Sequence, residues 1–301
     1  MRETHPRLRR GLTAVLATAI LTGFCLDLPA ARADALDRIA RTGVLNVGTR
    51  ASARPFAFRN AGGNFSGFSV DLVRVIRRSL AEQLGRPIEL RFQAVTTQSR
   101  LELLQRGDLD LVCGLTTPTW ARERIVDFTV PIFVDGTRIL TYRRFGQAGL
   151  SGLQGKRVGV LENATTEQVV ALAMPSTDIV RFASMTEAMA ALEAREVAAV
   201  ANIGVLLETL RIESSRPTSM MLVPRDGVLQ REFMACVVPQ NQSRLRDAVN
   251  RALSQSFSGL DELSGAYAET YFAWFGYEGE IYYPLTETRR NILLAARMWL
   301  K

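Results

Sequence analysis

Histidine and lysine are almost absent from this sequence of 301 residues. The one histidine is His5, and the lysines are Lys156 and Lys301. Histidine triads, histidine metal sites and histidine acid–base catalysis are therefore excluded from the chain beyond its N-terminal segment. The positive charge comes from scattered arginines without a basic block or interleaved aromatic residues, which argues against a nucleic-acid partner.

Residues 1–33 have the pattern of a secretory signal peptide. A basic start precedes an apolar run over Gly11–Leu21, and Ala31-Arg32-Ala33 has the small-x-small form of a cleavage site. We therefore expect the mature chain to start at Asp34. The alternative is an uncleaved membrane anchor, for which the apolar run is short. Five arginines and two acidic residues lie in this segment, so its removal lowers the formal net charge from +7 to +4.

Two cysteines remain after Asp34, Cys113 and Cys236. Each ends a short apolar run, LDLVC or EFMAC, which predicts a buried strand. In an oxidising compartment two such cysteines more often pair than stay free, so we expect a Cys113–Cys236 disulfide. Two buried free thiols are the alternative. Two lone cysteines do not make a metal site, and we expect no metal.

Apolar runs alternate with amphipathic segments along the chain. Val44–Thr49 and Ile88–Val95 are predicted strands, and the helix expected between them, Asp71–Leu84, ends at a glycine. This alternation predicts an α/β fold with a mostly parallel sheet. Near the C-terminus, aromatic residues at positions 267, 271, 274 and 275 recur at helical spacing, which indicates a packed helix rather than a stacking platform.

Two later strands are important for the prediction of the site. Ile132–Tyr142 is expected as a long strand broken only at Asp135-Gly136, after a turn over Phe128–Pro131. Phe233–Val238 is expected as a further buried strand. The segment Asn163-Ala164-Thr165-Thr166-Glu167 has an N-cap pattern for a helix that runs through Ala173, whose free N–H groups would favour an anion.

A loop rich in hydroxyl groups follows the apolar run Leu109–Cys113. It contains Thr116, Thr117 and Thr119, and Arg122 follows on a short helical turn. Arginine supplies a planar fork that matches two oxygens, and threonine supplies short donors beside it, so this loop is suited to carboxylate capture. An ordinary surface turn with solvated arginines is the alternative.

With these residues in place, the sequence resembles the periplasmic solute-binding proteins of the amino-acid type, family 3, that feed ABC importers. The likeness is closest to the glutamate/aspartate-binding branch and covers nearly all of the chain after residue 33. The motifs that carry it are Val47-Gly48-Thr49-Arg50, Gly67-Phe68-Ser69-Val70-Asp71, Thr97-Gln98-Ser99-Arg100, Cys113-Gly114-Leu115-Thr116-Thr117, Arg122, Phe133-Val134-Asp135-Gly136-Thr137-Arg138 and Ala164-Thr165-Thr166-Glu167.

The resemblance implies a two-lobed periplasmic-binding-protein fold of type II, with two hinge strands and a ligand cleft between the lobes. Lobe one would comprise residues 34–138 and 235–301, and lobe two residues 139–234. In such a protein Arg122 and Thr117 would hold an α-carboxylate, to which Thr166 would add a donor. A second carboxylate would be held by further residues of lobe one, namely Arg50, Thr97 and Arg100. Leu115 and Asn202 complete the predicted ligand-binding set.

Two positions depart from the pattern of this family. An aspartate that neutralises the ligand's ammonium group in the amino-acid binders falls on Ile203, and a histidine used by the glutamate binders corresponds to Met185. An ammonium group against an isoleucine would lose its hydration without gaining a counter-charge. Our hypothesis is therefore an acidic ligand with two carboxylates, whose amine is absent, substituted or held otherwise, for example by Asn202 or by backbone carbonyls.

The expected protein is a monomeric binding protein of the periplasm that delivers its ligand to an ABC permease in the inner membrane. We expect no cofactor and no enzymatic activity. One alternative is an enzyme on the same fold, similar to cyclohexadienyl dehydratases, which needs a carboxylic acid of raised pKa in the cleft. Glu162 and Glu167 are the candidates near the predicted site. Another alternative is a ligand-sensing subunit with the same cleft.

Overall fold

The computed structural model describes residue 1 and residues 34–298. The chain divides into two units, Met1–Ala33 and Asp34–Lys301. The predicted signal peptide lies outside the described residues apart from Met1, so it stays a prediction. Within the described part of the chain, no helix has both the length and the apolar character needed to cross a membrane.

The main sheet of the second unit is mixed. Strands β1, β5 and β6 pair in parallel, and so do β8, β9 and β10, while β7 and β12 are antiparallel to each other. Along the sheet the order is β5-β1-β6-β12-β7-β10-β8-β9, and β11 also pairs with β7. The strands are β1 (Val44–Thr49), β5 (Glu89–Ala94), β6 (Leu111–Val112), β7 (Val126–Tyr142), β8 (Arg157–Leu161), β9 (Asp178–Phe182), β10 (Ala199–Ile203), β11 (Met220–Val223) and β12 (Gln230–Pro239). A small second sheet contains β2 (Ser52–Ala53), β3 (Ala57–Arg59) and β4 (Phe65–Ser66).

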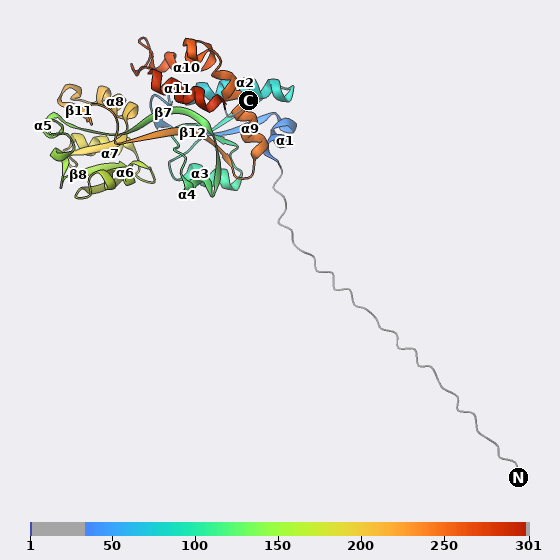
Figure 1. Ribbon diagram of the computed structural model, residues 1–301, viewed down its shortest axis with the longest axis horizontal. Coiled ribbons are helices and arrows are strands. Elements are labelled where there is room, and N and C mark those ends of the chain that lie inside the picture. The colour runs from blue at the N-terminus through green and yellow to red at the C-terminus, as the bar shows by residue number, and fades with distance from the viewer. Residues whose placement is uncertain (2–33, 299–301) are drawn as a thin grey trace. The chain divides into compact units, whose positions relative to one another are not determined.

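Strands β7 and β12 connect the two parallel halves of the main sheet (Figure 1). β7 pairs with β12 over much of its length and then with β10 and β11 toward its end. The change occurs around Thr137, which is paired with Gln230 on β12 and with Ile203 on β10. These are the two connecting strands expected of the predicted fold class, and that prediction is confirmed. The proposed lobe boundaries at residues 138 and 235 stay predictions.

The predicted break in β7 at Asp135-Gly136 is wrong, and so is the predicted turn over Phe128–Pro131. β7 runs without interruption from Val126 to Tyr142, and the irregularity lies instead in its register with β12, next to Ala235. Gly136 is needed for close packing and not for a turn. A Cβ atom there would lie 2.4 Å from the carbonyl oxygen of Gln230.

Helices surround the sheet, and the helical segments predicted above are among them (Figure 1). Gly43, Gly85 and Gly107 end the first three in left-handed backbone conformations, and the end of α2 at Gly85 confirms its prediction. The helices are α1 (Ala35–Thr42), α2 (Phe68–Leu84), α3 (Ser99–Arg106), α4 (Trp120–Glu123), α5 (Arg143–Gly146), α6 (Thr166–Ala173), α7 (Met185–Glu193), α8 (Gly204–Glu213), α9 (Ser243–Ser256), α10 (Gly265–Phe275) and α11 (Glu287–Met298), with short 3₁₀ turns at η1 (Gly149–Leu153), η2 (Pro217–Ser219) and η3 (Leu260–Glu262).

Helix α8 has no counterpart in the sequence analysis. Its N-cap residue, Ile203, has no side chain that can accept a hydrogen bond. The cap comes from a distant strand instead, because the carboxylate of Asp135 accepts the Val205 N–H at 2.8 Å. A start signal supplied by a residue 70 positions away along the chain is invisible to local pattern analysis.

Aromatic side chains form the centre of the core beside β7. Phe56, Phe68, Phe133, Tyr271 and Phe275 are all buried and pack at ring-centroid distances of 4.9–6.1 Å. The two tyrosines of α10 are anchored through their hydroxyl groups, that of Tyr271 to a backbone carbonyl at 2.8 Å. The prediction that the aromatic C-terminal segment is a packed helix is confirmed.

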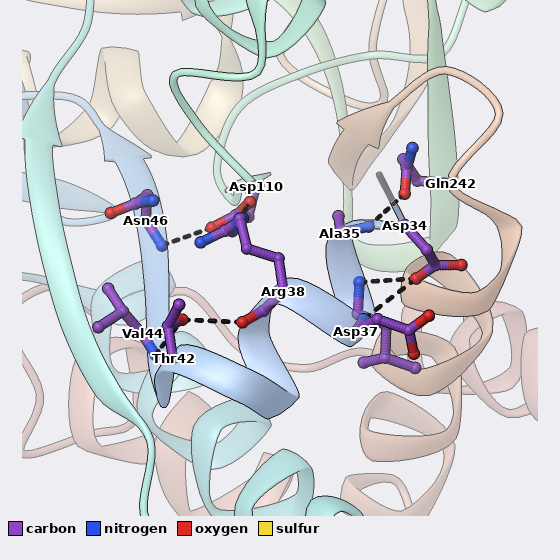
Figure 2. A network of polar contacts seen from close by, with 10 residues as sticks. Asp34, Ala35, Asp37, Arg38, Thr42, Val44, Asn46, Asp110 and Gln242 are labelled. Carbon is purple, nitrogen blue, oxygen red and sulfur yellow. Dashed lines mark hydrogen bonds and ion pairs between the residues drawn. The ribbon is translucent and has the colours of Figure 1, made fainter. Parts of the chain in front are cut away.

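The start of the described unit is held by a polar network (Figure 2). Asp34 caps α1 by accepting the N–H groups of residues 36 and 37 at 2.9 and 3.2 Å. Gln242 accepts the Ala35 N–H at 2.7 Å. Asp110 pairs with Arg38 on α1 and accepts the backbone N–H of β1 residue Asn46 at 2.8 Å. The network fixes α1 against β1 and the start of α9.

Cys113 and Cys236 form a disulfide, as predicted. The bond joins the residue after β6 to β12, and both cysteines are buried. It closes a loop with a sequence separation of 123 residues. A cross-link of this kind stabilises a fold mainly by restricting the unfolded chain.

We expect the double substitution Cys113→Ala with Cys236→Ala to lower the free energy of unfolding by about 2–4 kcal/mol, because the unfolded chain regains its freedom. Urea unfolding followed by circular dichroism measures the change. The wild-type protein unfolded in the presence of a thiol reductant should match the variant. An unchanged midpoint in both cases would show that the bond contributes no stability.

Candidate functional site

A small cavity lies where the ends of several strands from both halves of the sheet meet. Its volume is about 40 Å³. Four of its described lining residues are ionisable, three arginines and one glutamate. The lining comprises Arg50, Ser52, Ala53, Thr97, Arg100, Leu115, Thr117, Arg122, Leu161, Ala164, Thr165, Thr166, Met185, Asn202, Ile203, Leu206, Glu232 and Met234.

Arg50 and Thr97 follow the carboxyl ends of the neighbouring parallel strands β1 and β5. The ends of parallel strands meet at one edge of a sheet, and here the guanidinium of Arg50 donates a hydrogen bond to the hydroxyl oxygen of Thr97 at 2.9 Å. Burial lowers the pKa of Arg50 from its ordinary value. Thr97 therefore orients the guanidinium of Arg50 at the wall of the cavity without neutralising its positive charge.

Arg100 is the most deeply buried of the three arginines, with 4% of its surface exposed. It lies in the first turn of α3 and donates to the backbone carbonyl of Leu115 at 3.2 Å. Its Nε atom is buried and has no hydrogen-bond partner among the described residues. Burial, and then the positive charges of Arg122 and Arg50, hold its pKa well below the ordinary value. An anion bound in the cavity would stabilise the charged form of Arg100 and so raise its pKa again.

Arg122 extends from α4, whose N-terminus is capped by Thr119. Its guanidinium donates to the carbonyl of Thr117 at 2.7 Å and to the carbonyl of Asn163 at 3.0 Å. Asn163 precedes α6, so this arginine bridges residues that come from the two halves of the sheet. Burial lowers the pKa of Arg122, and the negative charge of Glu232 opposes this shift.

The facing wall is formed by α6, β10 and α7. The hydroxyl of Thr166, the first residue of α6, is buried and has no partner in the described part of the chain. The side-chain oxygen of Asn202 accepts the N–H of the next residue at 2.8 Å. Ile203 and Met185 are buried and apolar. The expected N-cap bond of α6 is not formed, because Thr165 has helical rather than extended backbone angles, and its hydroxyl donates to Glu232 instead.

The hydroxyl of Thr165 donates to Glu232, a lining residue that was not predicted from the sequence. The Glu232 carboxylate accepts the hydroxyl groups of Thr117 at 2.7 Å, Thr137 at 2.5 Å and Thr165 at 2.6 Å. Only 2% of the residue is exposed. The strand was predicted over Phe233–Val238, and Glu232, although it starts the run EFMAC, was not named as a candidate. Two-residue alternation continued back from the apolar side chain of Met234 would have marked position 232 as inward-facing.

The prediction that Glu162 and Glu167 are the acidic candidates near the site is wrong. Neither lines the cavity, and Glu162 is exposed. Glu167 forms an ion pair with Arg181 outside it. Glu162 and Glu167 were chosen because they lie close in sequence to a predicted binding motif. The buried carboxylate of the cavity comes instead from the antiparallel strand β12, which is distant in sequence.

The structure brings all of the predicted ligand-binding residues to this one cavity. They are Arg50, Thr97, Arg100, Leu115, Thr117, Arg122, Thr166 and Asn202. Their role in binding stays a prediction. In the described part of the chain, no group of three or more histidine, cysteine, aspartate or glutamate residues could hold a metal ion.

Residues 45–277 match the family model for bacterial extracellular solute-binding proteins, family 3. The chain belongs to this family. The predicted resemblance is thereby confirmed, and the protein is a solute-binding protein of the amino-acid type that serves ABC transporters.

Several characterised relatives are named for glutamate and aspartate. The chain is 34% identical over 164 residues to a glutamate/aspartate import solute-binding protein of Escherichia coli strain K12, a match that spans 54% of each chain. The protein of the same name from Salmonella typhimurium strain LT2 is 26% identical over 89% of each chain. An L-glutamate/L-aspartate-binding protein of Pseudomonas aeruginosa is 26% identical over 87% of each.

Solved structures have the same fold. An ancestral arginine-binding protein bound to glutamine superimposes with a TM-score of 0.66 at 28% identity, over 78% of this chain and 98% of that one. An ancestral amino acid-binding protein, a precursor of cyclohexadienyl dehydratase, gives a TM-score of 0.68 at 24% identity, over 81% of this chain and 100% of that one. The second likeness concerns the fold alone.

In this family 3 protein the connecting strand β7 is tied to the C-terminal segment. The Asp135 carboxylate accepts the hydroxyl of Tyr283 at 2.6 Å as well as the N–H that starts α8. Burial raises the pKa of Asp135, and the hydrogen bonds from Tyr283 and Val205 partly oppose that shift. Arg289 on α11 donates to the Tyr283 hydroxyl at 2.7 Å. One buried carboxylate therefore links β7, α8 and the segment before α11.

We expect Tyr283→Phe to lower the free energy of unfolding by about 1–2 kcal/mol at neutral pH, because the buried Asp135 carboxylate loses a donor. Without that donor the pKa of Asp135 rises further, so protonation of Asp135 stabilises the folded variant more than it stabilises the folded wild type. The difference in free energy of unfolding between the two proteins should therefore narrow as the pH falls through the pKa of Asp135. Urea titrations over a pH series measure it.

Tyr282→Phe is the matched control, since the neighbouring tyrosine is 63% exposed and should tolerate loss of its hydroxyl. If the two variants unfold at the same urea concentration at every pH, the hydroxyl contact with Asp135 contributes nothing to stability.

Proposed function

We propose that this protein captures a small acidic amino acid or a similar dicarboxylate in its cavity and delivers it to an ABC permease. One observation carries the proposal. Arg50, Arg100 and Arg122 line one buried space, and none of them forms an ion pair within 4.0 Å with another described residue. Buried and half-buried guanidinium groups without an ion-pair partner favour an anionic ligand, and several of them together favour one with two negative charges.

The positions of the arginines suggest how two carboxylates would be shared. Arg122 would hold one carboxylate, with the free hydroxyl of Thr166 as a further donor. Arg100 and Arg50 would hold the other, and each charge-assisted contact would contribute about 1.5–3 kcal/mol. The hydroxyl of Thr117 already donates to Glu232, so we propose that Thr117 acts through its carbonyl, which orients Arg122.

Relatives support the acidic assignment. The three curated relatives described above carry glutamate and aspartate in their names, at identities of 26–34%. Other members of the family are named for glutamine, such as the glutamine-binding protein GlnH of Bacillus subtilis at 25% identity over 80% of this chain. The arginine set of the cavity is therefore the stronger argument for an acidic ligand.

Ligand binding would act through the two connecting strands. We propose lobes of residues 34–138 with 235–301 and of residues 139–234, because β7 exchanges its partner β12 for β10 around Thr137. Arg122 and Thr166 would contact the ligand from the two lobes and favour the closed arrangement. The closed form of a monomer in the periplasm would then dock on the permease.

We also propose that the protein is not an enzyme. The relatives that match most of the chain are named as import or binding proteins for amino acids, which supports this proposal. A subunit that senses the ligand for a membrane partner would use the same cavity.

Calorimetric titration with L-glutamate, L-aspartate, 2-oxoglutarate and succinate tests the proposed function. We expect at least one of these acids to bind with a dissociation constant in the micromolar range or below. L-glutamine and L-arginine serve as neutral and basic comparisons. Tight binding of either of these, with no heat from any of the acids, would refute the assignment.

Arg122→Ala should weaken binding of the best acidic ligand by a factor of at least 100, because a bidentate contact worth about 3 kcal/mol is lost. Titration calorimetry gives the dissociation constants. Arg124→Ala is the control, since this neighbouring arginine is exposed and does not line the cavity. Equal affinities of the two variants would exclude Arg122 from the binding site.

Arg50→Ala should reduce the preference for doubly negative ligands rather than abolish binding. We expect the affinity ratio of the best acid over its amide to fall about tenfold, since one charge-assisted contact to the second carboxylate disappears. Arg50→Lys retains the charge and should keep part of the ratio. An unaltered ratio in Arg50→Ala would place the second carboxylate elsewhere.

A further inference from the structure

We propose that Glu232 binds the ammonium group of the ligand, and hence that the ligand is an acidic α-amino acid rather than a dicarboxylate without an amine. The inference rests on the proposed function and deepens it. It assigns a specificity-determining role to a residue outside the predicted ligand-binding set.

Glu232 supplies the negative charge among the described residues that line the cavity, and Arg122 lies next to it. The two are joined through Thr117, whose carbonyl accepts from the Arg122 guanidinium at 2.7 Å and whose hydroxyl donates to the Glu232 carboxylate at 2.7 Å. The charge of Glu232 also raises the pKa of Arg122, against the effect of burial. A cation and an anion side by side are complementary to the carboxylate and ammonium groups on one α-carbon.

The carboxylate of Glu232 retains capacity for a further donor. An ionised carboxylate has about four acceptor positions on its two oxygens. Thr117 and Thr165 donate to Oε2, while Thr137 alone donates to Oε1. The position left on Oε1 can accept an N–H group from an ammonium ion.

No described cation forms an ion pair within 4.0 Å with this carboxylate, although the charge of Arg122 lies nearby. The ion pairs within 4.0 Å that involve described residues do not include Glu232, although only 2% of the residue is exposed. A buried carboxylate held by neutral hydroxyl groups alone is costly compared with one that has a cationic partner. A ligand ammonium group would supply that partner when the cavity is filled.

The other candidates in the wall are poorer acceptors. Ile203 is apolar, and the side-chain oxygen of Asn202 already accepts a backbone N–H. Ile203 is paired across β7 with Thr137, and Thr137 donates directly to Glu232. The Glu232 carboxylate, which comes from β12, therefore lies near Ile203, the uncharged residue at the end of β10.

Glu232 also bridges the two halves of the sheet, since Thr117 and Thr165 come from opposite sides of the cavity. A purely structural role would therefore also make the residue sensitive to substitution. The experiment must separate an effect on the ammonium group from an effect on closure of the cavity.

The test compares L-glutamate with 2-oxoglutarate, which has the same carbon skeleton and a carbonyl group in place of the amine. Both are titrated calorimetrically into the full-length protein and into Glu232→Gln, which preserves the size and one acceptor oxygen of the side chain but removes its charge. We expect the affinity for L-glutamate to fall at least tenfold in Glu232→Gln and the affinity for 2-oxoglutarate to stay the same or rise. Thr165→Val is the matched control, because it removes the bridging hydroxyl and leaves the charge.

Thr165→Val should change both affinities by the same factor. An equal loss for both ligands in Glu232→Gln would overturn the inference and assign the residue to closure of the cavity. Binding of 2-oxoglutarate but not L-glutamate by the wild type would also overturn it, while the proposed function would stand. If the wild type binds neither these two acids nor L-aspartate nor succinate, the proposed function fails, and this inference fails with it.

Discussion

The central constraint on this structure is the placement of three guanidinium groups, one buried and two half-buried, around one small space. Like charges repel, and each guanidinium group loses hydration when it leaves water. Without a compensating interaction, exposure of these groups to solvent would be more favourable. Here the strand ends and the turns of α3 and α4 hold Arg50, Arg100 and Arg122 in place through neutral carbonyl and hydroxyl oxygens. These contacts orient the arginines but leave their charge for something that enters from outside. The carboxylate of Glu232, the one acidic group among the described lining residues, makes the electrostatic pattern of the cavity specific rather than merely positive.

The elements that could be predicted from the sequence are those with local signals. Val44–Thr49 was recovered as a strand because its apolar run is bounded on the N-terminal side by Gly43, and α2 because its apolar stripe ends at Gly85. The arginines of the cavity were found through motifs that follow strand ends, and topology then brings such ends together. The disulfide was predicted for a similar reason, since both cysteines end apolar runs.

What could not be predicted depends on contacts between distant parts of the chain. The start of α8 is capped by Asp135 from β7, and the continuity of β7 depends on the close approach of Gln230 to Gly136. Glu232 was missed because a charged residue at the start of an apolar run is normally taken as exposed. Its burial depends on hydroxyl groups from three separate segments, none of which is adjacent in sequence.

The disulfide has a consequence for the geometry of the cavity wall. Cys113 lies four residues before Thr117, and Cys236 lies four residues after Glu232, the partner that accepts the Thr117 hydroxyl. The covalent bond and the hydrogen bond therefore close a small ring of chain at the base of the ligand site. In a reducing compartment only the weaker link of that ring persists. Protein recovered from cytoplasmic expression and protein exported before it folds would thus differ in how firmly the negative group of the site is positioned, even though their sequences are the same.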